Sequence, residues 1–99
     1  MVDSKQILMY LSTNKDRLQK EYHLTRIGLF GSLARGEQTV NSDIDLIVEF
    51  ENETPDLYSL KTKLKHEIQS KFNVPVDICR EKYIKPVFRN LILSEARYA

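Results

Sequence analysis

The stretch LFGSLARGEQTVNSDIDLIVEF, residues 29–50, places a Gly-Ser pair directly after one apolar run and two aspartates at the start of the next. The second run, residues 42–50, is apolar enough to be a buried strand, and Asp43 and Asp45 are its exceptions. Burying a charge without a partner is costly, so a strand of this kind does not carry two carboxylates by chance. The stretch therefore predicts a functional site at the start of a strand.

Helical and strand patterns alternate on both sides of this stretch. The expected elements are a helix over 4–22, a strand over 25–31, one or two helical turns after Gly31, a strand over 42–50, a helix within 52–72, a strand over 73–80 and an amphipathic helix over 86–98. Ser4 is the expected N-cap of the first helix, and Pro55 suits the first turn of the long one. We therefore expect an α/β (α+β) fold in which a small mixed sheet of about three to four strands has helices packed on one face.

Length and composition narrow the class of protein. The 99 residues predict a single domain over 1–99, with 41% hydrophobic and 29% charged residues, as is ordinary for a globular chain. The formal net charge of +1 argues against binding to nucleic acid driven by bulk electrostatics. The sequence contains no apolar stretch of the ~20 residues that a membrane helix needs, no signal-peptide pattern and a single cysteine. These features favour a cytoplasmic protein without a membrane partner.

The two faces of the expected strands differ in chemistry. Successive side chains of a strand point to opposite faces, so one face is aliphatic and the other carries the aspartates. The aliphatic sets are Ile44, Leu46 and Val48 on the second strand and Val74, Val76 and Ile78 on the third. If these strands are neighbours, Asp77 lies about 4.8 Å from the strand that carries Asp43 and Asp45. Alternatively, Asp43 is a loop or strand-end acid and Asp77 is an exposed residue of an edge strand.

Three carboxylates placed this closely predict a cation between them. They repel one another unless a positive charge intervenes, and hard oxygen ligands suit Mg²⁺ or Mn²⁺ rather than zinc. The Gly-Ser turn adds a place for an anion, since Gly31 lets the backbone turn sharply, and Ser32 and Arg35 can donate hydrogen bonds to a phosphate. The alternative for Ser32 is that it only caps a short helix.

A phosphate site facing a divalent-metal site is what nucleotidyl transfer requires. One Mg²⁺ would bind the triphosphate of the nucleotide, and a second would lower the pKa of the attacking hydroxyl. Because positioning and charge neutralisation supply most of the acceleration in such reactions, few side chains are needed.

The segment GSLARGEQTVNSDID resembles the signature of the DNA polymerase beta-like nucleotidyltransferase superfamily. The segments FGSLARGE and SDIDLIVEF, followed by VDIC and a closing ILSEARYA, are similar to the minimal nucleotidyltransferase (MNT) family, so the resemblance covers most of the chain. It implies that Gly31 and Ser32 hold the nucleotide phosphates. It also implies that Asp43 and Asp45 bind the metal ions, and that Asp77 is the third carboxylate ligand and can act as general base.

The same resemblance implies a partner and a reaction. Members of this family resemble antitoxins encoded beside a HEPN-domain ribonuclease toxin, and the implied reaction transfers AMP from ATP to a tyrosine of that toxin. Larger relatives carry a helical acceptor-binding domain for which 99 residues leave no room, so we expect the acceptor site to be shallow or to be completed by another chain. A partner that presents its own hydroxyl fits this expectation. Two alternatives stay open: an antitoxin that neutralises by binding alone, and nucleotidyl transfer to RNA or to a small molecule.

The remaining polar residues favour ordinary roles. His23 and His66 lack the spacing of metal ligands, and Cys79 is expected to pack. Four lysines are expected to form the solvated face of the long helix: Lys61, Lys63, Lys65 and Lys71. Tyr98 has two open interpretations, closing the core or contacting a partner.

Overall fold

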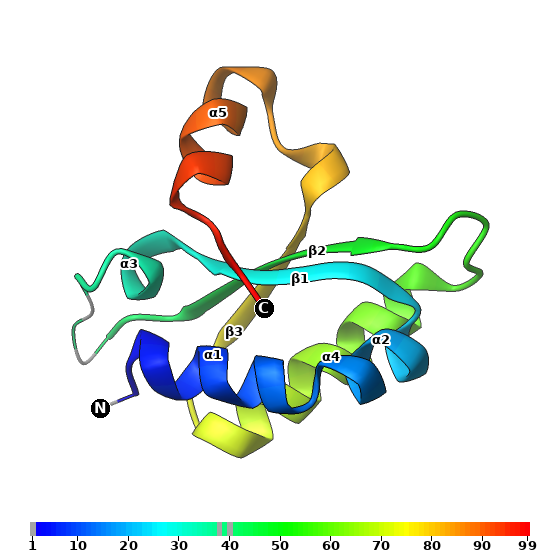
Figure 1. Ribbon diagram of the computed structural model, residues 1–99, viewed down its shortest axis with the longest axis horizontal. Helices are drawn as coiled ribbons and strands as arrows, with labels where there is room; N and C mark the ends of the chain where they lie inside the picture. The colour runs from blue at the N-terminus through cyan, green and yellow to red at the C-terminus, as the bar shows by residue number, and fades with distance from the viewer. Residues whose placement is uncertain (1, 38, 40) are drawn as a thin grey trace.

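The structure is a computed structural model that describes residues 2–37, 39 and 41–99, and a four-stranded mixed sheet forms its centre (Figure 1). The strands are β1 (Leu24–Phe30), β2 (Ile44–Phe50), β3 (Val76–Arg80) and β4 (Arg97–Tyr98). The helices are α1 (Ser4–Thr13), α2 (Lys15–Tyr22), α3 (Gly31–Ala34), α4 (Leu57–Phe72) and α5 (Pro86–Glu95), and a 3-10 turn, η1 (Glu81–Tyr83), follows β3. In Figure 1, α1, α2 and α4 lie together against one face of the sheet, and α5 lies on the other side. The expected fold class is confirmed.

The sheet order is β3-β2-β1-β4, which makes β3 an edge strand. β1 is antiparallel to both β2 and β4, whereas β2 and β3 run parallel and are joined through α4. A parallel pair needs such a long crossover, and the 16-residue α4 supplies it. Pro75 precedes β3 directly, and its carbonyl accepts a hydrogen bond from the backbone N–H of Ile44 at 2.9 Å. The strands expected over 42–50 and 73–80 are thus neighbours, which is the condition under which Asp77 was expected beside the strand of Asp43 and Asp45.

The aliphatic face of the sheet packs against the three helices below it. Ile44, Leu46 and Val48 are fully buried, as expected from their alternation along β2. The helices contribute the fully buried residues Ile7, Leu11, Leu18, Leu64 and Ile68. Burying one side chain of this size stabilises the fold by about 1.5–3 kcal/mol, so this layer is the main source of stability. It also fixes the register that turns Asp45 to the opposite face.

The N-terminal helix is divided into α1 and α2, and the prediction of one continuous helix over 4–22 is wrong. Asn14 separates them: its φ of −103° and ψ of 11° depart from helical values, and its side-chain amide donates to the carbonyl of Tyr10 at 2.9 Å beside its own backbone N–H at 3.0 Å. Asp3 rather than Ser4 is the N-cap: its carboxylate accepts from the N–H of Gln6 at 2.9 Å, and the Gln6 side chain accepts in return from the N–H of Asp3 at 3.1 Å.

The long helix begins later than predicted. Asp56 is its N-cap and accepts a hydrogen bond from the N–H of Ser59, so Pro55 lies before the helix and not in its first turn. Within the described residues, no helix has both the length and the apolar character needed to cross a membrane.

A partly buried carboxylate ties α4 to α1 and α2. Glu67 of α4 accepts hydrogen bonds from Tyr10 Oη at 2.6 Å, from Tyr22 Oη at 2.8 Å and from the Arg17 guanidinium at 2.6 Å. Because the three donors come from both N-terminal helices, this cluster holds all three helices together at the edge of the core.

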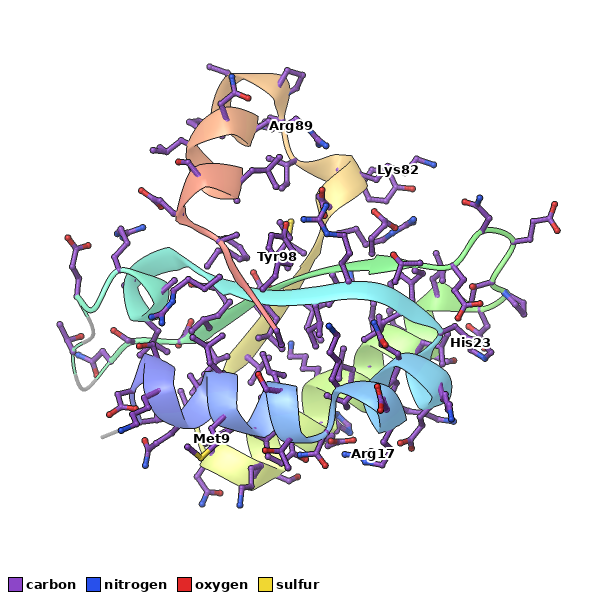
Figure 2. All side chains as sticks on the ribbon, viewed as in Figure 1. Met9, Arg17, His23, Lys82, Arg89 and Tyr98 are labelled. Carbon is purple, nitrogen blue, oxygen red and sulfur yellow. The ribbon has the colours of Figure 1, made fainter. Side chains whose placement is uncertain are left out.

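The C-terminal residues form a strand, and the prediction of a helix through residue 98 is wrong. Arg97 and Tyr98 pair with Leu29 and Gly28 of β1. A side chain at Gly28 would not fit, because a Cβ there would lie 2.9 Å from Tyr98 Cδ1. Tyr98, labelled in Figure 2, donates a hydrogen bond to the buried Glu81 at 3.3 Å. Tyr98 therefore packs within this chain, against β1 and Glu81 at the β4 edge of the sheet.

Helix α5 buries none of its residues, which the amphipathic pattern of residues 86–98 did not predict. Val87 and Leu91, expected on its packed face, are 80% and 58% exposed.

The face of the sheet that carries Asp45 is not open along its whole length, because Ile47, which shares that face, is fully buried. The second face is therefore open at the aspartates but closed farther along β2.

Candidate active site

Asp45 and Asp77 lie side by side on neighbouring strands. They are directly paired in the parallel register of β2 and β3, so both side chains leave the sheet on the same face. Asp45 is partly buried and Asp77 is exposed. Asp43, also exposed, precedes the first residue of β2 and has the same parity as Asp45. The predicted adjacency of strand positions is thus confirmed for the pair, with Asp43 at the near end of the strand.

The electrostatics of Asp45 reflect this crowding. Burial raises the pKa of its carboxyl group above the ordinary value, and the negative charges of Asp77 and then Asp43 raise it further. The positive charge of Arg35 lowers the pKa and only partly offsets these effects. Ionisation of Asp45 is therefore less favourable than that of a free aspartate, and a cation bound beside it would relieve the repulsion.

Gly31 allows the turn before α3 to lie against Asp45. Its φ of +78° belongs to the left-handed region that favours glycine. A Cβ built on Gly31 would overlap a carboxylate oxygen of Asp45 and would lie 3.2 Å from Asp45 Cγ. The absence of a side chain at position 31 is thus what brings the Gly-Ser turn and the carboxylate together.

Ser32 and Arg35 are both near the turn, but their hydrogen bonds go to protein groups. Ser32 Oγ donates to Ser42 Oγ at 3.4 Å, linking the turn to the residues just before β2. Phe30 is the N-cap residue of α3 and makes no side-chain capping bond, so the alternative that Ser32 caps this helix is wrong. Arg35 donates to Glu37 at 2.7 Å and to Glu95 of α5 at 3.0 Å. These bonds use Nε and Nη1 of the guanidinium, so Nη2 stays available to a phosphate.

The donor chemistry of the site fits a hard divalent cation. Across residues 2–37, 39 and 41–99, no three His, Cys, Asp or Glu side chains are arranged to enclose a metal ion. Mg²⁺ does not need such a cage, because it is usually bound by one or two carboxylates, with substrate phosphates and water completing six ligands. The adjacent carboxylates of Asp45 and Asp77 supply that share of the ligands.

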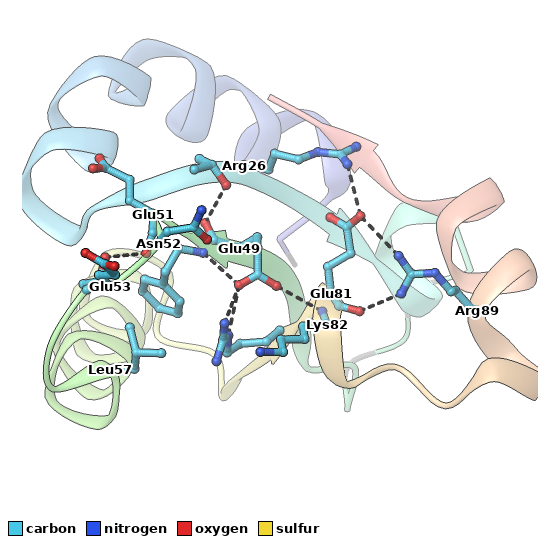
Figure 3. Close-up of a pocket in the computed structure, with 13 residues that line it drawn as sticks. Arg26, Glu49, Glu51, Asn52, Glu53, Leu57, Glu81, Lys82 and Arg89 are labelled. Carbon is cyan, nitrogen blue, oxygen red and sulfur yellow. Dashed lines mark hydrogen bonds and ion pairs between the residues drawn. The ribbon is translucent and has the colours of Figure 1, made fainter.

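One cleft, of about 580 Å³, lies at the end of β2 that is distant from the aspartates (Figure 3). Within it Arg80 binds Glu49 at 2.6 Å and Arg26 binds Glu81 at 3.1 Å, whereas Glu51, Glu53 and Lys82 of its lining form no ion pair with a described residue. Glu49 lies four residues beyond Asp45 on the same strand, so this cleft is separate from the aspartates. We place the candidate active site at the aspartates because Asp45 and Asp77 are paired there, next to Gly31.

A second cleft, of about 310 Å³, adjoins Asp77 and was not predicted from the sequence. Its lining residues are Tyr58, Lys61, Thr62, Lys65, His66, Asp77 and Ile78. All four lysines of α4 were expected on its solvated face. The structure places Lys61 and Lys65 in this cleft, and Lys63 and Lys71 outside it. The available signal was the spacing of four residues, which puts Lys61 and Lys65 on one side of the helix that leads to the strand of Asp77.

The chain is similar to known proteins along most of its length. Residues 11–99 match the family described as nucleotidyltransferase domain. The chain is 30% identical over 98 residues to protein adenylyltransferase MntA of Thermococcus cleftensis, covering 99% of this chain and 97% of that protein. It is 40% identical over 74 residues to a Methanocaldococcus jannaschii protein that is named as a protein adenylyltransferase, covering 75% and 84% of the two chains.

Two solved structures resemble the fold at a similar level of identity. A structure named as a minimal nucleotidyltransferase superposes with a TM-score of 0.72 at 30% identity, covering 97% of this chain and 95% of that one. A toxin-antitoxin structure containing AMP-PNP superposes with a TM-score of 0.66 at 25% identity, covering 87% of this chain and 69% of that one.

Proposed function

Because the chain belongs to the nucleotidyltransferase domain family, we propose that this enzyme transfers AMP from ATP to a partner protein as the antitoxin of a toxin-antitoxin pair. Similarity to a protein adenylyltransferase along nearly the whole chain supports a protein acceptor. The toxin-antitoxin structure with an ATP analogue supports both the antitoxin role and ATP as the nucleotide. The finer assignment, a tyrosine of a HEPN-domain ribonuclease encoded by an adjacent gene, rests on the family resemblance of the sequence.

The observation that carries the proposal is the pairing of Asp45 with Asp77 next to the Gly31 turn. The two carboxylates share one face, and the turn beside them has the backbone freedom that a close approach of phosphate needs. The proposal assigns Asp43, Asp45 and Asp77 to Mg²⁺. It assigns Gly31, Ser32 and Arg35 to the nucleotide.

In the proposed reaction, the acceptor hydroxyl oxygen forms a bond to the α-phosphorus of ATP. The bond from that phosphorus to the oxygen bridging the α- and β-phosphates breaks, and pyrophosphate leaves with the bonding electrons. The hydroxyl proton passes to Asp77, which is exposed at the sheet edge and open to an incoming acceptor. Mg²⁺ bound at the aspartates would neutralise phosphate charge and lower the pKa of the acceptor hydroxyl.

The chain's own residues position these groups. Asp45 is fixed by the buried register of β2, since Leu46 on one side of it in sequence and Ile44 on the other are both fully buried. Ser32 is connected through Ser42 to the segment that leads into β2. Such fixed placement supports catalysis, because holding the reacting groups in line removes most of the entropic cost of bringing them together.

The test is incubation with α-labelled ATP, Mg²⁺ and the protein encoded by the neighbouring gene. We expect label on the partner and loss of partner activity at substoichiometric amounts of this chain. The double variant Asp43→Ala/Asp45→Ala should transfer no label and should not neutralise substoichiometrically. An unlabelled partner that is neutralised equally by the double variant at matching amounts would refute catalysis and leave neutralisation by binding.

A further inference from the structure

We infer that the cleft between α4 and β3 is the acceptor side of the active site, and that Lys61 and Lys65 bind an acidic segment next to the acceptor hydroxyl. This inference rests on the proposed function and deepens it, because it names the chemistry of the protein segment that the enzyme recognises. It goes beyond the nucleotide site, whose residues Gly31, Ser32 and Arg35 lie in α3 and directly after it.

The order of the strands places the cleft. Gly31 follows β1, Asp45 lies on β2, and Asp77 lies on the edge strand β3, so the three succeed one another across the sheet. Beyond Asp77 comes the cleft, which is formed with residues of the first turns of α4. The Gly31–Ser32 turn, which is proposed to hold the phosphates, and the cleft are therefore on opposite sides of the two aspartates.

The geometry of phosphoryl-type transfer assigns these two sides. The attacking and leaving oxygens lie roughly in line through the phosphorus, so they occupy opposite sides of it. If the pyrophosphate leaves toward the Gly31 turn, the acceptor hydroxyl enters from the side of Asp77. The cleft beside Asp77 is the described concavity on that side.

The cleft has the charge of an anion-binding surface. Lys61 and Lys65 are four residues apart on α4 and so lie on the same side of the helix. The ion pairs among the described residues are all formed by arginines, so the ammonium groups of Lys61 and Lys65 are available to a bound carboxylate.

The composition and size of the cleft favour a short segment of an acidic protein. Among its lining residues Asp77 is the sole carboxylate, and the exposed Tyr58 and His66 add surface for contact. A volume of about 310 Å³ is at the small end of ligand clefts, which suits a few side chains and not a folded element. The net charge of +1 offers little long-range attraction to nucleic acid, so we favour a protein segment over RNA.

The experiment uses three fluorescent synthetic peptides with one central tyrosine, flanked by glutamates, glutamines or lysines. Binding to the full chain is followed by anisotropy with Mg²⁺ and AMP-PNP present. Two exposed charge pairs predict that the glutamate peptide binds about ten-fold more tightly than the glutamine peptide, and less so at high salt. The double variant Lys61→Gln/Lys65→Gln should lose this preference. Lys63→Gln is the matched control, because Lys63 is exposed on the same helix but does not line the cleft.

Three outcomes would overturn the inference. One is equal binding of the three peptides by the unaltered protein, and another is an equal loss of preference in Lys63→Gln. The third is a short RNA with a free 3′ hydroxyl that binds more tightly than every peptide and loses affinity in the Lys61→Gln/Lys65→Gln variant, which would make the acceptor a nucleic acid.

Failure of the proposed function has a different signature. In that case AMP-PNP binding with Mg²⁺ would be absent from the unaltered protein, or would be unchanged by Asp43→Ala/Asp45→Ala. The lysine variant should keep AMP-PNP binding, and thermal unfolding should show that it is folded. The two failures are therefore separable by one nucleotide-binding measurement.

Discussion

Replacing Gly31 by alanine tests the contact between the phosphate turn and Asp45. Gly31 has a φ of +78°, and a Cβ there would overlap the Asp45 carboxylate. Gly36 has a similar φ of +75°, but a Cβ at that position would meet no atom of the described residues within 4 Å. The two substitutions therefore impose the same kind of backbone strain, and only one of them displaces a carboxylate of the candidate active site.

The expected magnitudes follow from this difference. An alanine held in the left-handed region costs about 1–2 kcal/mol, so Gly36→Ala should lose roughly that much free energy of unfolding. Gly31→Ala should lose more, because its Cβ also overlaps the Asp45 carboxylate. In Gly31→Ala, Asp45 must also move by about 1 Å to reach van der Waals distance. A misplacement of that size costs about 100-fold in rate when it affects a reacting group. Gly36→Ala should therefore transfer AMP at a rate close to that of the unaltered protein.

The assay combines urea unfolding with AMP transfer from labelled ATP to the partner protein, both at a temperature where each variant is folded. In the background of Asp45→Ala, the stability cost of Gly31→Ala should fall to that of Gly36→Ala, because the overlapping carboxylate is gone. Equal transfer rates for the two glycine variants would show that the contact at Gly31 does not control the rate of AMP transfer. An unchanged stability cost of Gly31→Ala without the Asp45 carboxylate would show that this contact does not affect stability.

Three further predictions concern the fold. Leu46→Ala should lower the free energy of unfolding by about 2–5 kcal/mol in urea titrations, whereas Leu91→Ala, at a position 58% exposed, should change it by less than about 0.5 kcal/mol. Burial alone would raise the pKa of Glu67, but hydrogen bonds from the arginine and two tyrosines around it lower the pKa to about 2. The Glu67 carboxylate thus stabilises the fold above pH ~4.5, and this contribution is lost as the pH falls through ~2. In Glu67→Gln the fall in the free energy of unfolding over this pH range should be smaller by about 2 kcal/mol, a figure that allows for solvent screening. Gly28→Ala should displace Tyr98 and speed hydrogen exchange of the β4 amides, and unchanged exchange would contradict the close packing at that contact.

The parts of the fold predicted correctly are those set by long periodic patterns. The alternation along residues 42–50 and 73–80 predicted which faces carry Asp45 and Asp77, because one aliphatic face had to be buried. The sequence left open whether these two strands pair, and the structure makes them parallel neighbours joined through α4. No comparable pattern exists for β4, whose two residues are held by contacts of Tyr98 with Gly28 and Glu81, far away in the sequence.

The parts of the site that the sequence missed depend on tertiary neighbours. Arg35 has the right place for a phosphate ligand, yet its bond to Glu95 arises because α5 passes close to α3. Lys61 and Lys65 have the pattern of solvated residues, since periodicity reports which helix face is apolar and not which polar residues face a neighbouring strand. The division of α1 from α2 lies at one residue, Asn14, whose φ and ψ depart from helical values.

The most direct test of the proposed active site is a crystal of the protein with Mn²⁺ and AMP-PNP, analysed by anomalous scattering. We predict that the carboxylates of Asp45 and Asp77 bind the metal and that Asp43, at the start of β2, lies beside it. The phosphates of the nucleotide should lie against the Gly31–Ser32 turn. Metal and nucleotide bound in the cleft of Glu49 and Glu81, or aspartate side chains that turn away from an ordered nucleotide, would contradict this assignment.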